Sequence, residues 1–333
     1  MRAMVIRMGG DASVMKLETI ETPHPKPGEA RVHLKAAALN HRDIWQRKAY
    51  AGPAPMILGS DGAGTVAAVG SPEDGDWVGK DVVINPSLYW GDREDAPSSR
   101  FQILGNPTPG TYAEHIVIPV DNLALKPAHL NFVQAATLPL AALTSWRALF
   151  TQGDLKSGET LLLPGIGSGV AGLALAFGKR AGARVIVTSS GPQKLKDALA
   201  QGADAAINYT APDWEQQVRE AAGPGGIDLV LDHSGAQTIP AAIRLVRHGG
   251  RIVFLGATTG PQVTFSLRDV FFKQLHLIGT TMGSPREFEA LFRFIGNTRF
   301  TPDVRHIFRL EDAGAAHSLM EAGGQFGKIA LQI

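Results

Sequence analysis

The chain has 333 residues, enough for about two domains, and 32 Lys and Arg against 31 Asp and Glu give a formal net charge of +1. This balance gives no support to a nucleic acid or an anionic membrane as a partner. A hydrophobic fraction of 44% beside 19% charged residues excludes intrinsic disorder. The absence of cysteine excludes disulfides, thiol catalysis and cysteine-bound metal, and we expect a cytoplasmic protein without membrane spans.

The first third of the sequence has the pattern of β-structure. Residues 30–36 alternate strictly, with Ala30, Val32, Leu34 and Ala36 on one face and basic side chains on the other. This period of two is typical of a half-buried strand. Further short apolar runs between turn clusters predict a β-barrel or β-sandwich. They lie at 65–69, 81–84 and 113–118.

Residues 85–110 fit no regular pattern. The stretch is polar and contains prolines at positions 86, 97, 107 and 109. A connection of this length is either functional or a lobe that lacks its usual anchor.

From about Thr160 onward, strand and helix patterns alternate. Short, mostly apolar runs predict six strands, several of them covered on both faces. The runs are 161–163, 184–188, 205–207, 228–231, 251–255 and 275–279, and helical patterns occupy 170–181, 193–201, 214–222 and 239–247. This order predicts an α/β fold with a doubly wound parallel sheet.

A glycine motif follows the first of these strands. Gly167, Gly169 and Gly172 match G-x-G-x-x-G. Such glycines let the backbone approach a pyrophosphate, and the following helix points its amide groups at the phosphates. The position between a buried strand and a helix predicts dinucleotide binding, with a ligand-free turn as the alternative. The expected contacts are Gly165, Gly167, Ser168, Gly169 and Val170.

The end of the second strand discriminates between cofactors. Sites for NAD place Asp or Glu about 20 residues after the glycine loop, whereas this chain has Ser189, Ser190 and Lys194. Hydroxyls and a lysine suit the 2′-phosphate of NADP(H), which a carboxylate would repel. We therefore expect NADP(H). Helix capping by the serines and a solvated Lys194 are the alternatives.

With these motifs in place, nearly the whole chain resembles the medium-chain dehydrogenase/reductase superfamily. The segments that carry the resemblance are 36–43, 58–66, 110–114, 136–146, the glycine loop and Gly327-Lys328-Ile329. The resemblance implies a GroES-like β-rich domain at 1–126 and 284–333. It also implies that residues 127–283 form a Rossmann domain, with a doubly wound six-stranded parallel sheet.

The resemblance also bears on metal. Zinc-dependent members place zinc ligands where this chain has Asn40, Ser60 and a residue near Pro139. An amide and a hydroxyl do not make the usual nitrogen-and-sulfur zinc site. The cysteines of the family's structural-zinc lobe would fall within 85–110, and none is present. The resemblance therefore implies no metal and points to the zinc-free quinone oxidoreductase and enone reductase branch.

For that branch we expect hydride transfer from NADPH to a quinone or to the activated C=C of an α,β-unsaturated carbonyl. Hydrogen-bond donors would stabilise the oxygen that gains charge, and a hydroxyl or water would supply the final proton. The candidate catalytic residues are Asn40, Tyr50 and Thr144, each with a purely structural role as alternative. A metal-free alcohol or ketone oxidoreductase and a catalytically silent NADPH-binding protein are the competing functions.

Further cofactor contacts are expected where strands end, because ligands lie beyond the carboxyl ends of parallel strands. These positions are Ser234, Gly256, Ala257, Thr258 and Thr281. The resemblance adds Tyr209 near the adenosine phosphate and Lys328 as the late lysine that closes the cleft. The sixth strand would be an exposed apolar edge, and related enzymes join such edges, so we expect a homodimer.

Overall fold

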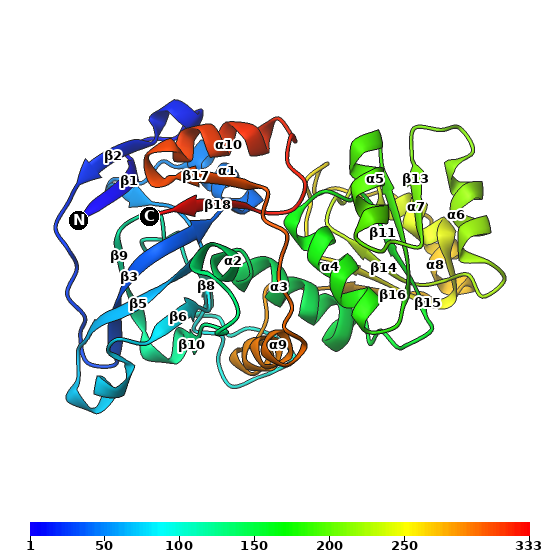
Figure 1. Ribbon diagram of the computed structural model, residues 1–333. Helices are drawn as coiled ribbons and strands as arrows, with labels where there is room; N and C mark the ends of the chain where they lie inside the picture. The colour runs from blue at the N-terminus through cyan, green and yellow to red at the C-terminus, as the bar shows by residue number, and fades with distance from the viewer. The chain divides into compact units, whose positions relative to one another are not determined.

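The computed structural model describes residues 1–333, and its contacts divide the chain into two compact units (Figure 1). The β-rich unit comprises Met1–Leu143 and Gly283–Ile333, and the α/β unit comprises Thr144–Met282. No helix of the chain is long and apolar enough to span a membrane.

The division between the units falls later than the boundary at 126/127 that we expected. Helix α2 (Phe132–Ala136) packs on strands β3 (Glu29–Ala38) and β5 (Asp61–Val69) of the β-rich unit. The backbone N–H of Leu140 also donates to the Asp61 carboxylate at 2.7 Å. These contacts tie residues 127–143 to the β-rich unit.

A seven-stranded sheet forms the centre of the β-rich unit. Its order is β10-β6-β5-β3-β18-β17, and β9 also pairs with β3. The predicted alternation in β3 is observed, since Ala30, Val32, Leu34 and Ala36 are fully buried. The other strands of this sheet are β6 (Asp81–Ile84), β9 (His115–Pro119), β10 (Leu123–Leu125), β17 (His306–Arg309) and β18 (Ile329–Gln332). Two smaller sheets of the unit comprise β1 (Arg2–Ile6), β2 (Lys16–Thr19) and β4 (Met56–Ile57), and β7 (Ser87–Leu88) and β8 (Gln102–Ile103).

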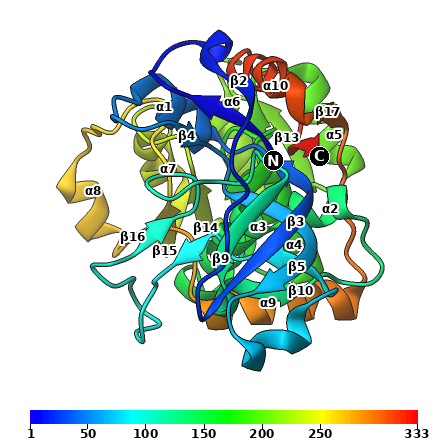
Figure 2. The ribbon, with the colours of Figure 1, turned by 90° about the vertical axis from the view of Figure 1, so that its left-hand side faces the viewer.

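The end of the chain returns to this sheet. Strand β18 pairs antiparallel with β3, with Ala330 of β18 opposite Ala38 of β3. The two strands lie side by side in Figure 1. This pairing places Lys328, just before β18, beside the C-terminal end of β3. The helices of the unit are α1 (His41–Ala49), α2, α9 (Pro285–Thr298) and α10 (Ala313–Glu321), and Figure 2 shows α10 near the β1–β2 hairpin.

Residues 85–110 contain only the short strands β7 and β8 and are organised by an aromatic side chain. Trp90 is 2% exposed, and its ring meets Phe101 edge-on. Its indole N–H donates to the carbonyl of Arg93 at 2.8 Å. The segment therefore has a small apolar anchor of its own, which the polar composition did not reveal.

The α/β unit contains the predicted six-stranded parallel sheet, in the order β13-β12-β11-β14-β15-β16. Strands β11 and β12 are almost fully buried, as their continuous apolar runs predicted. The strands are β11 (Thr160–Leu163), β12 (Arg184–Ser189), β13 (Ala205–Asn208), β14 (Ile227–Asp232), β15 (Val246–Phe254) and β16 (His276–Gly279). The helices are α4 (Gly169–Arg180), α5 (Pro192–Ala200), α6 (Trp214–Ala222), α7 (Ile239–Leu245) and α8 (Leu267–Phe272), while α3 (Pro139–Trp146) crosses the division between the units.

Candidate functional site

The glycine loop of the α/β unit connects β11 to α4. Gly165 and Gly167 have φ angles of +71° and +128°, a region that favours glycine. Ser168 caps α4, and its Oγ accepts a hydrogen bond from Ala171 N–H at 3.2 Å. The first turn of α4 thus leaves backbone N–H groups available to an anion, and its dipole favours negative charge there.

The side chains expected at a 2′-phosphate gather beside this loop. Tyr209 Oη donates to Ser190 Oγ at 3.1 Å, although 19 residues separate them. Lys194 lies over the loop, because a Cβ added to Gly167 would come within 2.9 Å of its Cδ. Ser189 is buried, and its Oγ accepts from Gly191 N–H at 3.1 Å. Ser190 and Tyr209 are thus joined, Lys194 lies beside Gly167, and Ser189 stabilises the turn. A contact of these side chains with a 2′-phosphate stays a prediction.

A pocket of about 290 Å³ opens between Gly165 and helix α7. Its walls combine apolar side chains with a few hydroxyl and amide groups, as is typical of sites for flat, partly polar ligands. The lining residues are Leu162, Pro164, Gly165, Thr188, Tyr209, Trp214, Ser234, Gln237, Thr238, Ala241, Ala242, Leu245 and Thr259. Sequence analysis identified Gly165, Tyr209 and Ser234 but not Trp214 or α7, because their helical patterns indicated only packing.

The loop after β14 contacts the glycine loop. His233 Nε2 lies 3.3 Å from Ser168 Oγ, and burial lowers the pKa of His233, against the opposing charge of Asp232. Asp232 holds the loop by accepting from Ser234 N–H and Gly235 N–H at 2.9 and 2.8 Å. His233 belongs to the segment 232–235 after the fourth strand, where the end of a parallel strand predicts cofactor contacts.

The other expected cofactor positions follow the last two strands of the six-stranded sheet. Thr258 Oγ1 lies 3.5 Å from the carbonyl of His233, so Gly256, Ala257 and Thr258 form a loop beside His233. Thr281 follows β16 and is exposed. The glycine cradle, the helix N-terminus and the pocket together fit a nicotinamide dinucleotide, and they lie within one unit.

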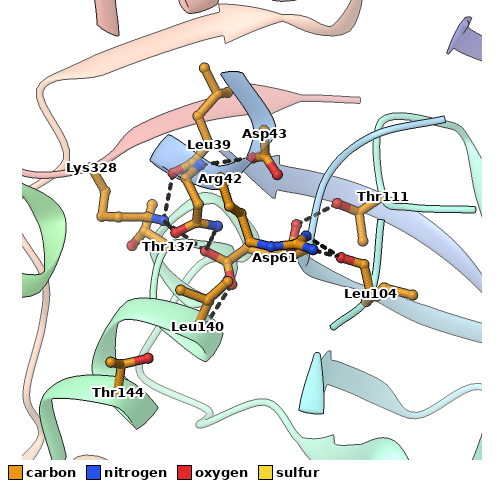
Figure 3. A network of polar contacts seen from close by, with 12 residues as sticks. Leu39, Arg42, Asp43, Asp61, Leu104, Thr111, Thr137, Leu140, Thr144 and Lys328 are labelled. Atoms are coloured by element: carbon orange, nitrogen blue, oxygen red, sulfur yellow. Dashed lines mark hydrogen bonds and ion pairs between the residues drawn. The ribbon is translucent and has the colours of Figure 1, made fainter. Parts of the chain in front are cut away.

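A second polar cluster lies in the β-rich unit (Figure 3). Lys328 Nζ donates to Asn40 Oδ1, to Asp61 Oδ2 and to the carbonyl of Leu39, each at 2.7 Å. Asn40 Nδ2 donates to the same Asp61 Oδ2 at 3.0 Å. All three side chains are less than 9% exposed. We call Asn40, Asp61 and Lys328 the amide cluster.

Neighbouring residues fix this cluster. Asp61 Oδ1 accepts from the Leu140 N–H near the start of α3, where a carboxylate is favoured. The Asn40 N–H donates at 2.8 Å to Asp43, which is fully buried and also accepts from the Tyr112 hydroxyl at 2.9 Å. Burial raises the pKa of the Asp43 carboxyl.

The residues at the family's zinc-ligand positions do not fit a zinc ion. Arg42 Nη1 donates to Ser60 Oγ at 2.7 Å, and the Lys328 ammonium holds the amide of Asn40. A guanidinium and an ammonium have no lone pair for a metal, and their charges repel a dication. Pro139 offers no side-chain donor.

The two other catalytic candidates lie apart from the amide cluster's hydrogen bonds. Tyr50 ends α1, and its hydroxyl donates to the carbonyl of Ala54 within the same loop. Thr144 is 5% exposed, and its Oγ1 faces Met282 Sδ at 3.9 Å. Neither contact tests a role in proton transfer, so both roles stay predictions.

A doubly wound parallel sheet with a glycine loop after its first strand is the architecture of dinucleotide-binding proteins, and comparisons with known proteins identify the family. Residues 26–128 match the Alcohol dehydrogenase GroES-like domain, and residues 169–297 match the Zinc-binding dehydrogenase family. The chain belongs to the medium-chain dehydrogenase/reductase superfamily, as the resemblance implied.

Individual relatives span nearly the whole chain. It is 33% identical to "Zinc-type alcohol dehydrogenase-like protein YogA" from Leptosphaeria maculans, over 96% of this chain and 94% of that protein. It is 30% identical to "2-methylene-furan-3-one reductase" from Solanum lycopersicum, over 97% of this chain and 76% of that protein. A crystal structure described as an NAD-dependent alcohol dehydrogenase is 41% identical, with a TM-score of 0.93 and complete coverage of both chains. Relatives of lower identity are named crotonyl-CoA reductase and probable quinone oxidoreductase.

Proposed function

We propose that the protein is a zinc-free reductase that uses NADPH to reduce a quinone or the C=C bond of an α,β-unsaturated carbonyl. The observation that carries the proposal is the amide cluster, in which the Lys328 ammonium and the Asp61 carboxylate hold the amide of Asn40, the residue that stands where the resemblance places a zinc ligand. Oxidation of an alcohol requires a Lewis acid or a base for its hydroxyl proton. Reduction of a conjugated acceptor requires only donors for the oxygen that becomes negative.

The names of several relatives support this choice of substrate. The Solanum lycopersicum protein is named for a compound with a C=C bond next to a ketone, and another relative is named for crotonyl-CoA. A third is named as a probable quinone oxidoreductase. All three substrates accept hydride at an electrophilic position conjugated to an oxygen.

The choice of NADPH depends on the residues beside the glycine loop. Ser190 and Tyr209 are joined by a hydrogen bond, Lys194 lies over Gly167, and no acidic residue occupies positions 187–194. A lysine and two hydroxyls can hold a 2′-phosphate, while NAD sites prefer a carboxylate. A similar structure is described as an NAD-dependent alcohol dehydrogenase, so the ratio of kcat/KM with NADPH and with NADH tests the choice of NADPH.

When bound, the reduced nicotinamide supplies a hydride to the electrophilic carbon of the acceptor. The protein's task is then to stabilise negative charge on the conjugated oxygen and to return a proton. Asn40 has two amide hydrogens, of which one is donated to Asp61. We assign the second to the acceptor oxygen. The Tyr50 hydroxyl or a water supplies the proton.

Steady-state assays with three substrates test the function. We expect NADPH oxidation with a 1,2-quinone or an enone, and no reduction of NADP⁺ with a simple alcohol. Turnover of the alcohol alone would instead establish the metal-free alcohol or ketone oxidoreductase; relatives named for alcohol dehydrogenase make the alcohol a necessary substrate in the assay. Tight NADPH binding without turnover of any electrophile would identify a silent nucleotide-binding protein.

A further inference from the structure

We infer that Lys328 and Asp61 are positioning residues, which together hold and polarise the Asn40 amide so that one of its hydrogens is presented to the acceptor oxygen. The inference rests on the proposed function and deepens it. It also gives Lys328 a different task from the cofactor contact that the resemblance implied.

The chemistry of the neighbours determines how the amide lies. A lysine ammonium can only donate, so the atom of Asn40 that it contacts at 2.7 Å is the carbonyl oxygen. An ionised carboxylate can only accept, so the atom 3.0 Å from Asp61 Oδ2 is the amide nitrogen. The orientation of the side chain is therefore fixed from both ends, with one N–H remaining.

The same contacts make that N–H a stronger donor. A positive charge at the amide oxygen draws electron density from the nitrogen, and such hydrogen-bond chains polarise one another. The effect is larger in a site with little water, and Asn40, Asp61 and Lys328 are 8%, 0% and 6% exposed. Removal of the ammonium should weaken the donor as well as free its orientation.

Lys328 has no hydrogen left for another partner. Its three N–H donors match its three acceptors, Leu39 O, Asn40 Oδ1 and Asp61 Oδ2. A phosphate contact by Lys328 would require one of these bonds to break. Asp61 is held in turn by Leu140 N–H, and its carbonyl accepts from Thr111 Oγ1 at 2.7 Å. This rigid support is what a preorganised donor requires.

A double-mutant cycle tests whether Lys328 acts through Asn40. We expect Asn40→Ala to lower kcat by about 100-fold, in the range for loss of one oxyanion donor. Lys328→Met should lower kcat by about 10- to 100-fold with a smaller change in KM. In the Asn40→Ala background, Lys328→Met should change kcat by less than about threefold. Multiplied losses in the double variant would overturn the inference.

Two further variants separate positioning from folding. Lys328→Met leaves the Asp61 charge buried without its partner, whereas the Asp61→Asn/Lys328→Met double variant removes both charges and should fold. Its kcat should fall to the level of Asn40→Ala. The control is Lys273→Met in the α/β unit, where the ammonium donates to the carbonyl of Ile243 at 2.7 Å; its kcat should equal that of the wild type.

A structural readout keeps the inference independent of activity. If the wild type reduces neither a quinone nor an enone, the proposed function fails, but crystal structures still test the positioning. We expect the Asn40 side chain to be rotated in Asp61→Asn/Lys328→Met relative to the wild type. An Asn40 amide with unchanged position and partners would overturn the inference.

Discussion

Lys194 is the charged side chain that most directly separates the two nicotinamide cofactors. It lies on α5 with its aliphatic part against Gly167 and Gly191. A lysine in this place attracts a phosphate as a point charge. The hydroxyls of Ser190 and Tyr209 lie within hydrogen-bond distance of each other and complete the set.

Lys194→Ala should therefore raise KM for NADPH about tenfold, corresponding to the loss of one charge-assisted contact. KM for NADH should change by less than about twofold, because its ribose lacks the phosphate that Lys194 would bind. Lys196→Ala is the matched control, since Lys196 lies exposed on the same helix. Equal losses with both cofactors, or a wild type that prefers NADH, would contradict the assignment.

At this scale, sequence analysis found the residues of the glycine loop but not the role of Lys328. The loop residues are neighbours in the chain, so their spacing alone carries the signal. The partners of Lys328 in the amide cluster are 288 and 267 residues away, at Asn40 and Asp61. The pairing of β18 with β3 brings Lys328 to Asn40, and the pairing of β3 with β5 brings Asp61 to the same end of β3.

At the scale of elements, α1 and α10 are joined through a buried histidine. His317 is completely buried, and its Nδ1 lies 3.1 Å from Arg47 Nη1. Arg47 also pairs with Glu321, and the His317 ring meets Tyr112 edge-on. Burial, followed by the Arg47 charge, lowers the pKa of His317 from 6.5 to about 3.

This lowered pKa gives the fold a defined pH dependence. Between pH 6.5 and about 3, the unfolded chain binds a proton at His317 and the folded chain does not. The free energy of unfolding therefore decreases as the pH falls through this window. His317 contributes at most about 1.4 kcal/mol of this decrease per pH unit. From pH 7.5 to 5.5, the free energy of unfolding should fall by roughly 1 kcal/mol more for the wild type than for His317→Gln.

Urea unfolding of the wild type and of His317→Gln at the two pH values measures this difference in the free energy of unfolding. The same substitution at exposed His248 controls for general effects of pH. If His317→Gln has the same pH dependence as the wild type, the histidine is not buried in its neutral form as described.

Sequence patterns predicted the six parallel strands well, because buried strands are continuous apolar runs. They predicted β15 less well. It begins at Val246 rather than near Arg251, since Arg247, His248 and Gly249 resemble a turn in composition. Parallel pairing with β14, with a register shift, overrides that local signal. Trp90 in 85–110 is a similar case, because its contact with Phe101 depends on the fold of an irregular segment and has no periodic pattern to reveal it.

At the scale of the whole molecule, β16 leaves the sheet with an open edge, which we propose as the contact of a homodimer. It is the last strand of the six-stranded sheet and pairs only with β15. Phe271 and Phe272 on the preceding helix α8 are 58% and 61% exposed. An open strand with exposed aromatic side chains nearby is unfavourable for a monomer in water.

Light scattering during gel filtration should give twice the 35.4 kDa chain mass. Gly279→Glu should shift the protein towards monomer, since pairing of the two edges would bury an unpaired carboxylate on each chain. The monomer can accommodate a side chain here, because an added Cβ meets only Phe254 at ordinary contact distance of 3.6 Å. A monomeric wild type would contradict the proposal.

The central claim is that fixed groups of the protein replace a metal. Its most direct test is the rate of NADPH oxidation with an enone or quinone before and after thorough treatment with a chelator. Metal content is measured on the same samples. We predict unchanged kcat at substoichiometric metal. One tightly bound zinc per chain, with activity lost on its removal and restored on its return, would contradict the account.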